Sequence, residues 1–93
     1  MIPEDNDPKP SLLTFPCEFP IKVMGKADPA FEGAVMQIMR KHVPDLGEGA
    51  IKEHYSKEGK YVSMTVVITA TSQEQLDTIY RELTADSHVI VVL

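Results

Sequence analysis

From Phe19 to Leu93 the sequence divides into six periodic segments, in the order strand, helix, strand, strand, helix, strand. Turn and capping residues mark nearly every junction, so most segments have a definite beginning and end. A strand-helix-strand unit that occurs twice, with a hairpin between the copies, buries two apolar helix stripes on one face of a four-stranded antiparallel sheet. The order therefore predicts an α+β protein with the ferredoxin-like βαββαβ sandwich.

The chain of 93 residues has room for one hydrophobic core, because a chain of this length buries only part of its surface on folding. Its first eleven residues contain three prolines and three acidic side chains without apolar periodicity. We therefore expect a flexible N-terminal tail over residues 1–14, followed by one domain over residues 15–93.

The first and third strands carry the clearest two-residue alternation, which predicts that they lie in the middle of the sheet. The first should begin near Pro20 and end at Gly25, with Ile21 and Val23 on its apolar face. In the third strand the apolar face is formed by alternate residues, namely Val62, Met64, Val66 and Ile68. The opposite, open face of the sheet should then present Lys22, Met24, Tyr61, Ser63, Thr65 and Thr69.

Start signals stand before both helical segments. Asp28 followed by Pro29 supplies a capping carboxylate and a residue whose fixed φ suits the first helical turn. This helix should end at His42, because basic residues there complement the negative end of the helix dipole. For the second helix, Ser72 with Gln75 three residues later forms a capping-box pattern.

The two predicted edge strands differ in their protection. Residues 51–56 carry charged side chains of the kind that guard an edge against pairing, whereas residues 89–93 read Val-Ile-Val-Val-Leu. We expect contact with an unknown protein partner, or a homodimer, at this unprotected edge and on the neighbouring open face. The predicted interface residues are Val89, Ile90, Val91, Val92, Tyr61, Ser63 and Thr65.

Charge and apolar content disfavour several classes of partner. Nine basic against fourteen acidic residues give a net charge of −5, so no nucleic-acid partner is expected. The longest apolar run, residues 89–93, is far shorter than a membrane helix, and the N-terminus lacks the basic and apolar regions of an export signal. These observations predict a cytoplasmic protein without membrane contact.

Cysteine and histidine, the usual metal ligands and reactive groups, are sparse. Cys17 is the single cysteine and has no neighbouring base or cation to activate its thiol. The histidines fall at a helix end and on opposite predicted edges of the sheet, namely His42, His54 and His88, which does not suit a shared metal ion. We therefore expect no catalytic residue, no metal and no cofactor.

The loop from Gly25 to Asp28 is a candidate ligand site, because it joins a central strand to a helix N-terminus, where free N–H groups and the helix dipole attract anions. Lys26 would assist such binding. The alternative is a plain strand-to-helix turn in which Asp28 itself caps the free N–H groups. Both readings stay open, and the candidate ligand residues are Gly25, Lys26 and Asp28.

A set of residues in this chain resembles the YbeD-like family of small bacterial proteins, and the resemblance extends from Leu12 to Leu93. It rests on Phe15-Pro16, Phe19, Lys22-Val23-Met24-Gly25, Gly59-Lys60-Tyr61, Ser63, Thr65, Ile68, Ala70 and Ile79-Tyr80. The resemblance implies a ferredoxin-like fold similar to ACT domains, which are regulatory modules that bind amino acids, usually at interfaces between paired domains. It places an effector near Gly25 to Asp28, where ACT loops typically have a second glycine and this chain has Asp28-Pro29.

The leading hypothesis is a non-enzymatic regulatory or adaptor module that acts in trans through protein contact, with ACT-like sensing of a small amino-acid-like ligand. The alternatives are a small acylphosphatase-like enzyme and an RNA-binding sheet. The enzyme would need an Arg in the phosphate loop and an Asn to orient water, whereas Arg40 and Arg81 fall late in the predicted helices and the sole Asn is Asn6. The RNA-binding sheet would need several stacking aromatics, and the predicted open face offers Tyr61 alone.

Overall fold

The computed structural model describes residues 13–93, so the predicted tail lies outside the described residues except for its last two positions. The predicted succession of elements is confirmed. The elements are β1 (Cys17–Lys26), α1 (Pro29–His42), the 3-10 turn η3 (Glu48–Ala50), β2 (Ile51–Tyr55), β3 (Tyr61–Ala70), α2 (Gln73–Ala85) and β4 (Val89–Val92).

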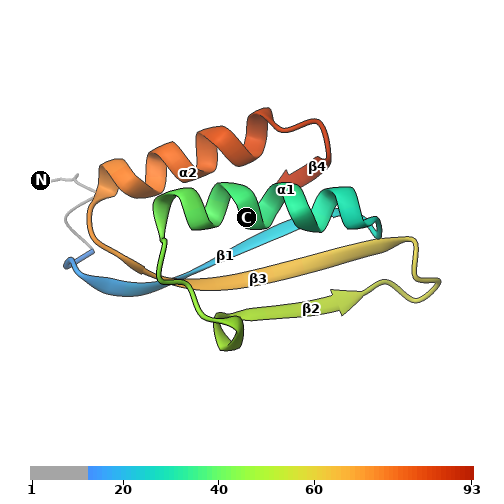
Figure 1. The fold of residues 1–93 in the computed structure, drawn as a ribbon, viewed down its shortest axis with the longest axis horizontal. Helices are drawn as coiled ribbons and strands as arrows, with labels where there is room; N and C mark the ends of the chain where they lie inside the picture. Colours follow the sequence, from blue (N-terminus) through green and yellow to red (C-terminus); the bar gives the residue numbers. More distant parts are fainter. Residues whose placement is uncertain (1–12) are drawn as a thin grey trace, which may run out of the picture.

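The strands form one antiparallel sheet in the order β2-β3-β1-β4, and both helices cover the same face of it (Figure 1). The two strands with the cleanest alternation, β1 and β3, therefore occupy the middle, as predicted. Each helix connects two strands that are not neighbours in the sheet: α1 joins β1 to β2, and α2 joins β3 to β4. This is the arrangement of the ferredoxin-like α+β sandwich. The open face lies on the side of the sheet away from α1 and α2.

The core fills the space between the helices and the sheet. Its side chains come from alternate positions of the two central strands and from one stripe of each helix, as the periodicities predict. They are Ile21, Val23, Phe31, Val35, Met39, Val43, Val62, Met64, Val66, Ile68, Ala70, Leu76, Ile79 and Leu83. Leu13, which the sequence assigned to the tail, packs against this core as a partly buried side chain.

The predicted bounds of the first strand were wrong, because β1 begins at Cys17 and continues through Gly25 to Lys26. The Lys22 N–H bonds to the carbonyl of Leu93, the residue after β4, and successive residues point their N–H groups to opposite sides. The nitrogen of Pro20 therefore points to the same side as that of Lys22. No strand within residues 13–93 lies beside β1 at that point, so Pro20 removes no ladder bond and the strand passes through it.

The predicted helix starts are confirmed by their hydrogen bonds. The Asp28 carboxylate accepts the Ala30 N–H at 2.8 Å, and the Ser72 hydroxyl accepts the Gln75 N–H at 3.1 Å. The Gln75 side chain reaches back one residue further than in a capping box, because its oxygen accepts the N–H of Thr71 at 2.8 Å. The predicted hairpin is also confirmed, because β2 and β3 pair antiparallel, and its loop contains Gly59 in the left-handed conformation with a φ of 74°.

Replacing Val66 by Asp should lower the free energy of unfolding by several kcal/mol, because Val66 is fully buried between Ile21 and Ile51 and the new carboxylate would have no partner. Urea unfolding followed by circular dichroism measures the loss. Val67→Asp is the matched control, because Val67 is the next residue of β3 and lies half-buried on the open face. In this variant the free energy of unfolding should fall by only about 1 kcal/mol. Equal losses in the two variants would contradict the assignment of the buried face.

Candidate functional site

The turn between β1 and α1 depends on the absence of a side chain at Gly25. A Cβ atom at this buried position would collide with Cδ1 and Cε1 of the Phe31 ring and would lie 2.7 Å from the His88 carbonyl oxygen. Phe31 is itself fully buried, so the ring has little room to move. Gly25, predicted as a ligand residue, therefore has a packing role that brings α1 and the α2–β4 turn close to β1.

Asp28 already satisfies the donors of the first turn of α1. Its carboxylate accepts the Ala30 N–H, and its carbonyl accepts the N–H groups of Phe31 at 3.0 Å and Glu32 at 3.3 Å. The backbone N–H groups at this helix start are thus engaged within the chain. The charges that remain for a ligand are the Lys26 ammonium and the Asp28 carboxylate.

A cavity of about 200 Å³ lies against this turn. It joins the β1–α1 turn to the α2–β4 turn, and its lining combines two charged, two polar and two apolar side chains. They are Lys26, Asp28, Phe31, Ser87, His88 and Ile90. We call it the turn cavity. A second hollow, of about 390 Å³, shares Lys26 and Asp28 and opens toward the β2–β3 hairpin at Gly59 and Lys60.

The α2–β4 turn is fixed by Asp86. One carboxylate oxygen of Asp86 accepts the backbone N–H of His88 at 2.8 Å and lies 2.9 Å from Nδ1 of the His88 ring. The backbone hydrogen bond, followed by the contacts with the ring, holds the pKa of Asp86 below its usual range. Ser87 and His88 were missed as site residues in the sequence, although the Asp-x-His spacing before a strand is a signal for such a turn.

The free edge of the sheet at β4 is apolar, as predicted, and we call residues 89–93 the β4 edge. Ile90, Val91 and Leu93 are exposed by 59%, 39% and 65%, whereas Val89 and Val92 are half-buried and pack against the core. Lys22 and Leu93 exchange both backbone hydrogen bonds, at 3.2 and 2.8 Å. Val92, one residue earlier, therefore points its N–H and C=O away from β1, toward the free side of the edge.

The other predicted interface residues lie on the open face. The register aligns Tyr61 with Lys26, Ser63 with Met24 and Thr65 with Lys22. The open face is thus continuous with the β4 edge, because Val91 pairs with Met24.

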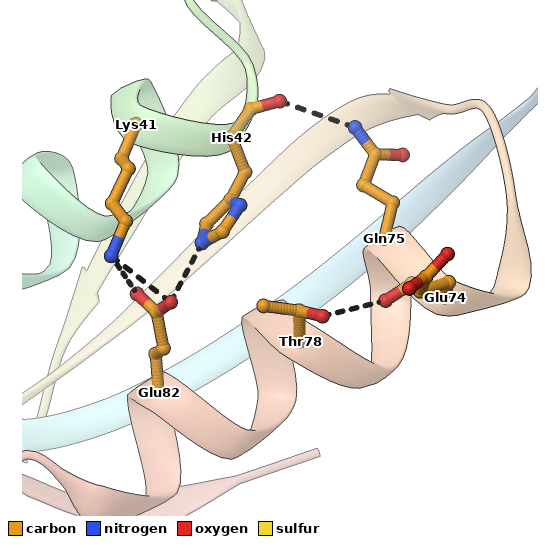
Figure 2. A network of polar contacts seen from close by, with 6 residues as sticks. All are labelled: Lys41, His42, Glu74, Gln75, Thr78 and Glu82. Atoms are coloured by element: carbon orange, nitrogen blue, oxygen red, sulfur yellow. Dashed lines mark hydrogen bonds and ion pairs between the residues drawn. The ribbon is translucent and has the colours of Figure 1, made fainter.

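A polar network joins the last turn of α1 to α2 (Figure 2). Glu82 of α2 lies 3.1 Å from the Lys41 ammonium and 3.1 Å from Nε2 of His42, and the Gln75 side chain donates to the His42 carbonyl at 3.2 Å. The hydrogen bond from Lys41 is the main cause of the lowered pKa of Glu82, and His42 adds to it. Sequence reasoning gave His42 only a role at the helix end.

The sheet order separates the remaining histidines. His54 lies in β2 and His88 directly before β4, at opposite edges of the sheet. Within residues 13–93, no group of three or more His, Cys, Asp and Glu side chains is placed to hold a metal ion. Over the same span, no helix is long and apolar enough to cross a membrane.

Solved structures place the fold in a known class. The chain is similar to the ACT domain from GTP pyrophosphokinase of Chlorobium tepidum, with a TM-score of 0.61, 18% identity, and coverage of 82% of this chain and 84% of that one. It is also similar to the uncharacterised protein TM1266 from Thermotoga maritima, with a TM-score of 0.62, 10% identity, and coverage of 82% and 92%. The fold is therefore that of a small α+β domain of the ACT-like, ferredoxin-like class.

Sequence comparison gives the family. Residues 10–93 match the family described as a protein of unknown function (DUF493). A UPF0250 protein of Neisseria gonorrhoeae is 46% identical over 89 residues, which cover 96% of this chain and 98% of the relative. One of Chromobacterium violaceum is 41% identical over 88 residues, covering 95% and 99%. The chain belongs to the DUF493/UPF0250 family, and the resemblance to YbeD-like proteins is confirmed.

Gly25→Ala should lower the free energy of unfolding by about 1–3 kcal/mol, because the added methyl group forces the Phe31 ring or the His88 carbonyl to move. Gly33→Ala is the matched control. Gly33 lies inside α1 with nothing within 4 Å of an added Cβ, so the same change should stabilise the protein by about 0.5–1 kcal/mol. Urea unfolding compares the two variants, and effects of the same sign would contradict the packing role of Gly25.

Glu82→Gln should reduce stability most above pH 5 and progressively less below it. The lowered pKa of Glu82 means that its contribution is fully present above the carboxyl pKa of the unfolded chain, about 4.3, and is lost as pH falls through the folded-state value. Denaturant midpoints of both proteins between pH 3 and pH 7 measure this. Glu74→Gln on the same helix is the control, and an equal pH-dependent difference in that variant would exclude the ion pair as the cause.

Proposed function

We propose that this protein is a non-enzymatic regulatory or adaptor module that acts through contact with another protein and senses a small amino-acid-like ligand. One observation carries the proposal. The turn cavity is lined at one end by Lys26 and Asp28 and at the other by Ile90, which belongs to the exposed β4 edge. A ligand in the cavity would therefore touch the surface that is best suited to hold a partner.

The lining of the turn cavity suits a zwitterion. Lys26 supplies a positive charge for a carboxylate, and Asp28 supplies a negative charge for an ammonium group. Ser87 and His88 add hydrogen-bonding groups, while Phe31 and Ile90 offer apolar contact for a short side chain. A volume of about 200 Å³ favours a molecule of amino-acid size over a larger metabolite.

Coupling between ligand and partner follows from their shared residue. If the ligand orders Ile90 in the position that a partner strand requires, each occupant raises the affinity for the other by the same factor. The unprotected β4 edge supports strand addition as the mode of contact, because Val92 directs its N–H and C=O outward. The same edge accommodates a second copy of this chain, which would give a homodimer.

The enzymatic alternative has less support. No arginine lines the turn cavity, since Arg40 lies in the last turn of α1 and Arg81 faces a shallow hollow on α2. An acylphosphatase-like reaction needs such a group to hold the phosphate. We therefore propose regulation and not catalysis.

Thermal unfolding of the full chain against the twenty amino acids tests the proposal, with the mass in solution recorded in parallel. A ligand at 100 times its dissociation constant stabilises the folded state by about 2.7 kcal/mol, which should raise the midpoint by roughly 10 °C or more in a chain of this size. Asp28→Asn should abolish the shift, because Asn caps a helix about as well as Asp but carries no charge. Lys26→Gln should do the same.

Matched controls change equivalent charges outside the cavity. Asp77→Asn on the exposed side of α2 and Lys57→Gln in the β2–β3 loop should leave the shift intact. A midpoint that no amino acid moves would remove the ligand from the proposal, and hydrolysis of acetyl phosphate by the wild-type protein would replace regulation with catalysis. Loss of any self-association in Ile90→Lys, with the fold retained, would assign that contact to the β4 edge.

A further inference from the structure

The open face of the sheet carries a group of lysines that we call the lysine face, made of Lys22, Lys26 and Lys52. The register places Lys52 and Lys22 on either side of Thr65 in one cross-strand row, and Lys26 opposite Tyr61 further along β1. All three side chains are exposed. They come from three positions separated by up to 30 residues, and the sheet alone brings them onto one surface.

The lysine face is positively charged, whereas the whole chain has a net charge of −5. The ion pairs within residues 13–93 use Lys41, Lys60 and two histidines, so none of the three lysines has a carboxylate within 4 Å there. On the open face of the four strands, the single acidic side chain is Glu18, which pairs with Thr69 at the far end of β1. Positive charge is therefore concentrated and unneutralised on this face.

The row next to Lys22 and Lys52 is mostly apolar or neutral. It contains His54, Ser63, Met24 and Val91, in that order across the sheet. Met24 is half-buried, Val91 is exposed by 39%, and Tyr61, opposite Lys26, is exposed by 44%. The face thus offers apolar contact between cationic groups and is not a uniformly charged surface.

The spacing suits a peptide. Lys22 and Lys52 are two strand spacings apart, about 10 Å, and Lys22 and Lys26 are four residues apart, about 13 Å. In an extended segment, side chains four residues apart lie on the same side, about 13 Å from each other, so two such carboxylates match the spacing of Lys22 and Lys26. The side chain midway between them also faces the sheet and lies over Met24.

We propose that the lysine face docks an acidic segment of a partner protein, with carboxylates on the lysines and apolar side chains on Met24 and Tyr61. A phosphate backbone fits less well, because the net charge of −5 repels a dense polyanion and Tyr61 is the one aromatic available for base stacking on the described open face. The lysine face shares Lys26 with the turn cavity and adjoins the β4 edge at Val91, but Lys22 and Lys52 lie in neither. The proposal therefore does not depend on the small-ligand hypothesis.

Titration of the isotope-labelled full chain with a synthetic peptide of repeating Glu-Ser-Leu-Ser tests the proposal by two-dimensional NMR, because an extended peptide of this sequence presents Glu and Leu in turn on one side. The amide shifts of β1 and β3 around Lys22, Met24 and Thr65 should change, and those of α1 and α2 should not. Lys22→Glu and Lys52→Glu should each lower the affinity for the peptide at least fivefold, because each variant loses one favourable charge contact and gains a repulsive one. Lys22→Gln removes the favourable contact without adding a repulsive charge, so the affinity for the peptide should fall by about half of the factor seen with Lys22→Glu.

Lys57→Glu is the matched control, because it makes the same change in net charge in the exposed β2–β3 loop, outside the lysine face. It should change the affinity less than twofold. Equal weakening in Lys57→Glu would show that only net charge matters and would overturn the proposal. So would shifts on the helices, equal binding of a peptide of repeating Lys-Ser-Leu-Ser, or tighter binding of a ten-residue oligothymidylate.

Discussion

The contact between the Phe31 ring and the backbone of Gly25 is the constraint on which much of this structure depends. The ring is fully buried against a position where even a methyl group does not fit. The His88 carbonyl approaches the same position, Gly25. The absence of one side chain therefore lets three separate segments meet: the end of β1, the start of α1 and the α2–β4 turn. The turn cavity lies at this meeting point, so its position follows directly from core packing.

Much of the fold could be predicted because its signals are local. Asp28-Pro29 and Ser72 fix the helix starts through side chains that bond to the next turn, and the alternation in β3 reflects one buried and one open face. The start of β1 could not be predicted, since Pro20 is acceptable inside a strand only where the neighbouring strand ends. That condition depends on the length of β4, which the sequence near Pro20 does not contain.

The candidate site was predictable only in part for the same reason. Lys26 and Asp28 stand in a recognisable strand-to-helix turn, and the structure places both in the turn cavity. Ser87 and His88 join them from about 60 residues further along the chain. The local sequence indicates a turn there, but it does not show that this turn lies against the start of α1. Along the β4 edge, a run of apolar residues cannot show which members face the core, and the structure divides it into half-buried Val89 and Val92 and exposed Ile90 and Val91.

The unequal lengths of β1 and β4 have a further consequence for aggregation. Over Lys22 to Gly25 the strand β1 is central, but its first half has no neighbouring strand on the β4 side within residues 13–93. The amides that face this gap belong to Glu18 and Pro20, because they share the direction of Lys22. Pro20 has no amide hydrogen to donate, and Glu18 carries an exposed carboxylate. Both features are ways in which natural sheets avoid pairing with other strands, so misassembly is discouraged where the first half of β1 has no neighbour on the β4 side.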